Sequence, residues 1–216
     1  MSVIGSASMF RLEDQKKSLL RTPGVIGVDE AGRGPLAGPV VAAAVVLPDG
    51  FDLRGLDDSK KLKAEVRRDL YARIRAEAAC AWHVVDAPDI DQINILQATF
   101  AAMRGAIEKL GPQAREALID GDRVPPGLAV KAAPVVKGDA TYASIAAASI
   151  VAKEVRDELM LQYAVQYPRY GFHRHMGYGT PEHLAALQMH GPCPIHRRTF
   201  ARVRELIEQP CLTLEV

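Results

Sequence analysis

Residues 25–47 constrain the fold of this chain more than any other stretch. They begin as a short apolar run that leads into two adjacent carboxylates, Asp29 and Glu30, and continue through a glycine-rich turn into a second run of Val and Ala. Two such runs predict a pair of strands. Because side chains alternate faces along a strand, the two acids could not both reach one site from a regular strand, so we expect the strand to end about there. Paired carboxylates beside a basic, flexible turn indicate a metal site that faces an anionic substrate, and the alternative is a hairpin with solvated acids.

Beyond residue 47, short apolar runs that predict strands alternate with longer stretches of helical spacing. Val66, Leu70 and Ile74 show that spacing in the first helix. The expected strands lie at 81–85, 117–119 and 130–136, and the expected helices at 63–79, from 89 or 91 to 110, 142–166, 181–189 and 199–208. This order predicts an α/β fold, with a mixed sheet covered by helices. We expect a loose N-terminal extension at 1–22 with a short helix at 12–20, one domain at 23–208, and a tail at 209–216.

Composition argues against several classes of protein. No run approaches the roughly 20 apolar residues of a membrane span, and the first residues lack the build of a signal peptide, so we expect a cytoplasmic protein. Cys80, Cys193 and Cys211 form no C-x-x-C pair, which argues against a disulfide framework and a cysteine zinc site. Residues 167–204 carry six arginines and five histidines but one acid. This stretch favours contact with nucleic-acid phosphates, and the alternative is a solvated basic face.

Acidic residues end three of the predicted strands: Asp29 with Glu30, then Asp120, then Asp139. Carboxylate oxygens are the ligands that suit Mg²⁺ or Mn²⁺, and four of them suit two ions. Such a pair of ions, about 3.5–4 Å apart, stabilises the attacking and leaving oxygens of a phosphoryl displacement. Taken singly, Asp120 could instead be a turn residue before glycine, and Asp139 a helix N-cap. The sequence pattern alone does not bring the acids together.

A series of ordered motifs makes the chain similar to bacterial ribonuclease HII. The resemblance covers residues 24–207, and it rests on VDEAGRGP at 28–35, DSKKL at 58–62, IDG at 119–121, KGD at 137–139, AAASIVAK at 146–153, GF at 171–172, His175, GY at 177–178 and HRR at 196–198. It implies a ribonuclease H-like fold, that is, a mixed sheet flanked by helices with a C-terminal helical extension. It also implies endonucleolytic cleavage of RNA in RNA–DNA hybrids and at single ribonucleotides embedded in duplex DNA. Cleavage 5′ of the ribonucleotide would leave 3′-hydroxyl and 5′-phosphate ends.

The resemblance also implies roles for individual residues. Asp29, Glu30, Asp120 and Asp139 would be the catalytic acids that bind Mg²⁺ or Mn²⁺, with two ions when substrate is bound. Gly32, Arg33 and Gly34 would contact the 2′-hydroxyl of the ribonucleotide, and Tyr178 would pack on the sugar of the following deoxynucleotide. The residue types agree with these roles, because glycines let backbone donors approach a 2′-hydroxyl closely and Arg33 adds a charge for the adjacent phosphate.

Two positions depart from the family pattern, which commonly has lysine where this chain has Met176 and asparagine where it has Asp122. Arg174 could supply the phosphate contact that the lysine would make. Asp122 could disturb metal affinity or face solvent.

Several polar residues have weaker assignments. Lys60 and Lys137, like Ser59 and Lys61, could bind substrate phosphates or be solvated loop residues. Ser149 and Lys153 lie one helical turn apart, where close helix packing is favoured over a phosphate contact. His173 and His175 lack the further ligands that a transition-metal site needs.

Two other functions compete with a metal-dependent ribonuclease. A Ser149–Lys153 hydrolase would work without metal. A hybrid-binding or DNA-binding module would bind without cleaving, through its C-terminal arginines and in a salt-sensitive manner. For the leading function the expected partners are RNA–DNA hybrid and ribonucleotide-containing duplex DNA, with no membrane, and we expect a monomer.

Overall fold

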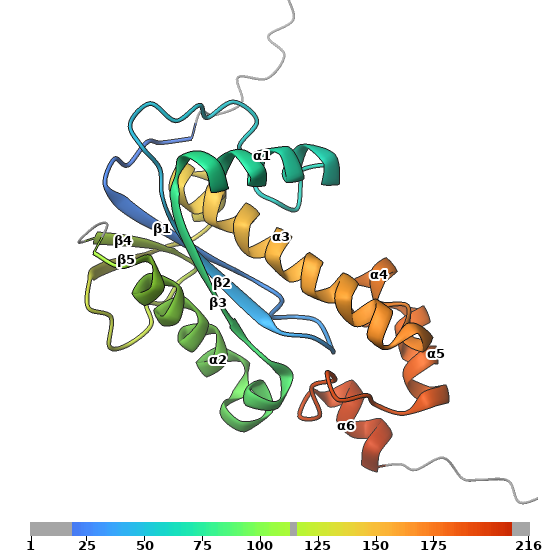
Figure 1. Ribbon diagram of the computed structural model, residues 1–216. Coiled ribbons are helices and arrows are strands. Elements are labelled where there is room, and N and C mark those ends of the chain that lie inside the picture. Colours follow the sequence, from blue (N-terminus) through green and yellow to red (C-terminus); the bar gives the residue numbers. More distant parts are fainter. Residues whose placement is uncertain (1–18, 113–115, 209–216) are drawn as a thin grey trace, which may run out of the picture.

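The computed structural model describes residues 19–112 and 116–208. Within these residues, five strands form one mixed sheet in the order β3-β2-β1-β4-β5 (Figure 1). The strands are β1 (Val25–Ala31), β2 (Val40–Val46), β3 (Ala79–Val85), β4 (Glu116–Asp120) and β5 (Lys131–Val135). β1 pairs antiparallel with β2 and parallel with β4, β2 pairs antiparallel with β3, and β4 pairs parallel with β5. The prediction of a mixed sheet with helices is confirmed.

Helices cover both faces of this sheet. α2 (Ala87–Leu110) packs on one face, and α1 (Ala64–Glu77) and α3 (Ala143–Gln166) pack on the other. β2 supplies both cores, because its successive side chains alternate between the faces. Val40, Ala42 and Ala44 face the α2 side, whereas the three residues between and after them, Val41, Ala43 and Val45, face the α3 side.

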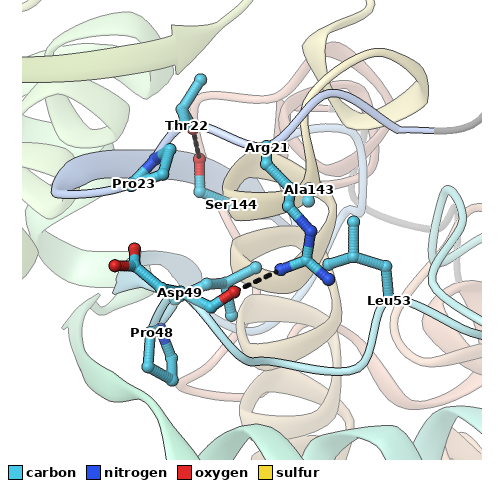
Figure 2. A pocket seen from close by; sticks show the side chains of 9 residues that line it. Arg21, Thr22, Pro23, Pro48, Asp49, Leu53, Ala143 and Ser144 are labelled. Carbon is cyan, nitrogen blue, oxygen red and sulfur yellow. Dashed lines mark hydrogen bonds between the residues drawn. The ribbon is translucent and has the colours of Figure 1, made fainter.

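The connection into the domain from its N-terminal side is tied to α3 and to the loop after β2 (Figure 2). Arg21, which falls within the predicted N-terminal extension, donates hydrogen bonds to the carbonyl oxygens of Asp49 at 3.0 Å and Phe51 at 2.7 Å. The hydroxyl groups of Thr22 and Ser144 lie 3.1 Å apart. The cavity between these segments has a volume of about 10 Å³, which is room for a single water. A cavity of this size is too small for a substrate, so these contacts serve to hold the segments together.

A third cluster of buried side chains holds the C-terminal part of the domain together. Its elements are the short 3₁₀ helix η2 (Pro168–Tyr170), α4 (Phe172–His175), α5 (Pro181–His190) and α6 (Ala201–Glu208). The side chain of Asp91 on α2 accepts hydrogen bonds from the backbone N–H groups of Arg198 at 2.8 Å and Thr199 at 3.0 Å. This contact fixes the segment before α6 to α2.

Several predicted elements differ from those observed. β1 continues one residue beyond the acidic pair, to Ala31. Val66 is 42% exposed and does not join the buried face of α1. α2 begins at Ala87 and is kinked at Asn94, which has a φ of 65° and accepts hydrogen bonds from two following N–H groups. α4 lies between the helices expected at 142–166 and 181–189, where no helix was predicted, and most of the helix expected at 12–20 falls outside the described residues. Among those residues, no helix is long and apolar enough to cross a bilayer.

Candidate active site

Strand pairing gathers the predicted acids at one end of the sheet. Val28 of β1 pairs with Ile119 of β4 in parallel register, so the next residues of the two strands, Asp29 and Asp120, come to the same edge. Asp139 lies in the 3₁₀ helix η1 (Gly138–Ala140), which follows β5. The N–H of Gly138 donates to Asp120 Oδ1 at 2.7 Å, and this bond brings Asp139 close to Asp120.

The acidic pair on β1 is divided between the two faces of the sheet. Asp29 is paired with Ala43 and Glu30 with Ala42, and these two alanines belong to the cores on opposite faces. Asp29 is only 5% exposed and interacts with Ser149 of α3. Its Oδ1 also accepts a 2.6 Å hydrogen bond from the N–H of Glu30. The regular strand therefore persists through both acids, and the site is shared because it lies at the rim of the sheet.

Burial and mutual repulsion act on the pKa values of these acids. Burial, followed by the charges of Glu30 and Asp120, raises the pKa of Asp29 well above its usual 3.8. Burial also raises the pKa of Glu30, although the neighbouring charge of Arg33 opposes the shift. The pKa of Asp139 is raised by burial and then by the charge of Asp120. The ionised forms of Asp29, Glu30 and Asp139 are therefore costly, and a bound cation would relieve that cost.

The donor set fits hard divalent cations, since it consists of carboxylate oxygens. Over residues 19–112 and 116–208, no three His, Cys, Asp or Glu side chains already converge as a ready-made set of metal ligands. The fit therefore rests on the chemistry of the acids and on their shared electrostatics. It does not rest on a preformed coordination shell.

Two cavities open on either side of Glu30 and Arg33, which line both of them. The first, of about 370 Å³, is lined by the glycine-rich turn and by a group of basic and hydroxyl side chains: Ser59, Lys60, Arg67, Ser149, Lys153, Arg156 and Tyr178. The second, of about 330 Å³, lies between α2 and the end of β4, and its lining includes Phe100, Met103, Asp120 and Arg123. Basic side chains beside the acids suit an anionic polymer.

Lys60 and Lys137 differ in their surroundings. Burial alone would lower the pKa of Lys60, but the charges of Asp29, Asp58 and Asp139 outweigh it and raise that pKa. Lys60 thus faces the acids. Lys137 has an exposed side chain at the start of η1, and a contact between it and substrate stays a prediction.

Ser149 and Lys153 do not form the pair that a serine hydrolase would need. Lys153 Nζ donates to Asp157 Oδ1 at 2.7 Å, whereas the Ser149 hydroxyl lies 2.8 Å from the Ser59 hydroxyl. Ser149 therefore connects the 58–62 loop to Asp29, a contact that the sequence pattern did not indicate.

The structure shows the surroundings of Asp122 and Met176, the two residues that depart from the family pattern. Asp122 points into solvent, with a side chain that is 80% exposed. The carbonyl oxygen of Met176 accepts a hydrogen bond from Arg156. Arg174 forms an ion pair with Glu182.

Sequence reasoning gave no role to two buried arginines, Arg156 and Arg197, and Arg197 holds the glycine-rich turn. Arg197 donates to the carbonyl oxygens of Gly32 at 2.5 Å, Arg33 at 2.9 Å and Gly38 at 3.0 Å. Burial, followed by the nearby charge of Arg156, lowers the pKa of Arg197 to about 9. Arg197 belongs to the HRR motif, which was a signal for its importance but not for its role.

Tyr178, 44% exposed, lines the same cavity as the turn and is backed by a chain of three hydrogen bonds. Cys193 N–H donates to His196 Nδ1 at 3.0 Å, and His196 Nε2 lies 3.0 Å from His183 Nε2. His183 Nδ1 lies 2.9 Å from the carbonyl oxygen of Tyr178, so it must be the donor there. Since Nδ1 of His196 is an acceptor, its Nε2 carries the proton, and both rings are neutral with one tautomer each.

His175 is used in a similar way and is not half of a metal pair with His173. Its Nε2 lies 2.8 Å from the carbonyl oxygen of Tyr170, and its Nδ1 accepts from the N–H of Gly177 at 3.3 Å. Neither ring nitrogen of His175 has a lone pair left for a metal, because both are hydrogen-bonded to the backbone.

The histidine chain predicts a specific pH dependence of stability. Burial, followed by the charge of His183, lowers the pKa of His196 from 6.5 to about 4. Between these values the unfolded chain binds a proton that the native state excludes, so stability is complete above pH 6.5 and falls as the pH drops toward 4. In urea unfolding measured from pH 4.5 to 7.5, we expect His196→Gln to reduce the slope by up to one proton, about 1.4 kcal/mol per pH unit.

The matched control for this prediction is His173→Gln, because His173 is exposed. It should leave the slope of the wild-type protein unchanged. A His196→Gln protein that keeps the full wild-type slope would show that His196 binds its proton equally well in the native and unfolded states, which contradicts the hydrogen-bond chain.

Comparison with known proteins identifies the family of this chain. The family model for Ribonuclease HII matches residues 26–203. The chain belongs to the ribonuclease HII family. A ribonuclease HII from Xanthomonas oryzae pv. oryzae is 57% identical over 187 residues, which cover 85% of this chain and 74% of that protein. One from Acidovorax sp. (strain JS42) is 56% identical over 191 residues, covering 87% and 90%.

Solved structures show the same fold. The ribonuclease H2 from Pyrococcus horikoshii OT3 matches with a TM-score of 0.71 and 26% identity, over 85% of this chain and 97% of that one. The RNase HII of Archaeoglobus fulgidus, solved in a complex with PCNA, matches with a TM-score of 0.69 and 26% identity, over 83% and 93%. The fold prediction is therefore confirmed as ribonuclease H-like. As a member of its family, the chain is a hydrolase, an endoribonuclease of the ribonuclease H type.

Proposed function

We propose that this protein is a metal-dependent endonuclease that hydrolyses the phosphodiester 5′ of ribonucleotides. Its substrates would be RNA–DNA hybrids and single ribonucleotides embedded in duplex DNA, and its products would carry 3′-hydroxyl and 5′-phosphate ends. The observation that carries the proposal is the position of four acids at one end of the sheet, beside a cavity lined by the 32–34 turn and Tyr178.

Each group around the cavity has a role in this proposal. Asp29, Glu30, Asp120 and Asp139 would hold one or two Mg²⁺ or Mn²⁺ ions, which supply Lewis-acid stabilisation of the attacking and leaving oxygens. The positive potential of Lys60 beside the acids favours the approach of a phosphate. Lys137 would contact the backbone from the start of η1.

Recognition would divide between two segments. The backbone of Gly32, Arg33 and Gly34 would read the 2′-hydroxyl, the group that separates RNA from DNA. The Arg33 side chain, half-exposed and 3.4 Å from Glu30, can turn toward a phosphate. The exposed ring of Tyr178 would pack on the sugar of the next deoxynucleotide. A cytoplasmic location and a monomeric state stay predictions.

The test is incision of a labelled DNA duplex that carries one ribonucleotide, with Mg²⁺, with Mn²⁺ and with chelator. We expect metal-dependent cutting 5′ of the ribonucleotide, no cutting of an all-DNA duplex, and a loss of at least about 10³-fold in Asp120→Asn. Asp122→Asn is the matched control, because it makes the same change two residues later at an exposed side chain. A folded wild-type protein that binds this duplex and a long hybrid but cuts neither would overturn the proposal and favour a binding module.

A further inference from the structure

The two segments that would read the substrate come from distant parts of the chain and lie side by side. The N–H of Leu36, after the glycine-rich turn, donates to the carbonyl oxygen of Gly177 at 2.9 Å. A Cβ on Gly177 would lie 2.5 Å from the carbonyl oxygen of Ala37, so the two backbones are in direct contact. The turn and the Tyr178 segment therefore form one wall of the 370 Å³ cavity.

A single side chain from α3 holds both of these segments. Arg156 is 1% exposed. Its Nε donates to the carbonyl oxygen of Pro39 at 3.1 Å, and its Nη2 donates to those of Ala37 at 3.2 Å and Met176 at 3.0 Å. The first two acceptors follow the turn, and the third lies two residues before Tyr178.

Arg156 also contacts Tyr178 and the glycine-rich turn directly. The centre of its guanidinium lies 5.9 Å from the ring centroid of Tyr178, within the range of a cation–π contact. Its Nε and Cδ occupy the space that a Cβ on Gly32 would need. The same side chain therefore supports the Tyr178 ring and packs against Gly32 of the turn.

This arrangement is costly if its purpose is only to fill space. Burial lowers the pKa of Arg156, which shows that its charge is poorly solvated. Well-packed apolar side chains of similar volume are often as stable as a buried ion. A planar guanidinium, however, directs several donors at fixed angles, which lysine cannot do. The guanidinium of Arg156 is therefore suited to fix the distance between the backbone after the turn and the backbone before Tyr178.

We propose that Arg156 is a specificity-determining positioning residue, which couples the 32–34 turn to Tyr178 and so sets the preference for a ribonucleotide that is followed by a deoxynucleotide. The inference rests on the proposed function. Arg197 provides the internal comparison, because its three carbonyl acceptors belong to Gly32, Arg33 and Gly38 and none belongs to the Tyr178 segment.

The experiment compares Arg156→Lys with Arg197→Lys, each alone and combined with Tyr178→Ala. The measured quantity is the ratio of kcat/KM for a duplex with one ribonucleotide to kcat/KM for a long RNA–DNA hybrid. We expect Arg156→Lys to lower this ratio about tenfold, and to change it by less than about twofold in the Tyr178→Ala background, since coupled residues are not additive. Arg197→Lys should lower kcat/KM for both substrates by similar factors and leave the ratio intact.

A purely structural role predicts a different pattern. If Arg156→Lys lowers both substrates alike, or if its effect on the ratio persists undiminished in Tyr178→Ala, the inference is wrong. Arg156→Gln serves as a second variant, because it removes the buried charge and keeps an amide donor, and it should change the ratio in the same direction. Thermal unfolding of each variant identifies any that fails to fold.

Failure of the proposed function would be visible separately, as a wild-type protein that cuts neither substrate. The inference is then decided by binding measured by fluorescence anisotropy in chelator. The ratio of Kd for the long RNA–DNA hybrid to Kd for the single-ribonucleotide duplex should fall in Arg156→Lys and not in Arg197→Lys. Equal ratios in these two variants would overturn it.

Discussion

Asp29→Asn is expected to lower the rate of incision by at least about 10³-fold while stabilising the metal-free protein. The two effects have one cause. Asp29 is buried beside Glu30 and within range of the charge of Asp120, so its ionised form is costly without a cation. Asparagine removes the charge but keeps an oxygen that can accept the 2.6 Å hydrogen bond from Glu30 N–H. We expect the free energy of unfolding in chelator to rise by on the order of 1 kcal/mol.

Adding Mn²⁺ should reverse the order of stability. A ligand that binds only the native state stabilises it more when it binds more tightly, so the wild-type protein should gain more than Asp29→Asn does. Thermal unfolding of both proteins, in chelator and in millimolar Mn²⁺, measures this crossover alongside the incision assay. Asp69→Asn on the exposed face of α1 is the matched control and should change neither quantity. Asp29→Asn that is less stable than wild type in chelator would show that the carboxylate is satisfied without a cation.

Much of the fold could be predicted because its strongest elements have strong local patterns. The Val and Ala run that ends at residue 47 was expected to be a strand and contains β2, and the alanine-rich helix expected at 142–166 is α3, one residue shorter. The kink in α2 was not predicted, because it depends on Asn94 adopting a positive φ, which few residues other than glycine do. The acidic pair was placed correctly at the end of the sheet, but the strand does not end before it.

The contacts that hold the site residues in place are harder to predict from the sequence. Arg156 and Arg197 both bind backbone carbonyl oxygens that lie more than 100 positions earlier in the chain. Arg156 also binds the carbonyl oxygen of Met176. A carbonyl oxygen is present at every residue, so no side-chain pattern marks the ones that a buried arginine will choose. The contact between Ser59 and Ser149 likewise depends on how a loop folds against α3. Motif resemblance can suggest which residues matter, whereas their partners follow only from the packing.

The packing of α3 on β1 makes Gly27→Ala the substitution with the largest expected effect on stability. The added Cβ would fall on the backbone carbon and oxygen of Ser144 and the backbone nitrogen of Ile145, well inside van der Waals contact. Gly27 has no positive φ, so the effect is steric and not conformational. α3 can only move away from the sheet, and we expect a loss of about 3 kcal/mol or more. Urea unfolding measures the loss, and Gly50→Ala, where a Cβ meets nothing within 4 Å, is the control.

A pair of double variants separates a backbone clash from a side-chain clash. At Gly105 the added Cβ would lie 2.5 Å from Cγ of the His83 ring, so Gly105→Ala should be rescued by His83→Ala. Gly27→Ala should not be rescued by Ser144→Gly, because the atoms in its way belong to the backbone. A Gly27→Ala protein within about 1 kcal/mol of wild type would mean that α3 can shift freely. Ser149, which α3 places beside Asp29, would then be positioned by its bond to Ser59 and not by the contact between helix and strand.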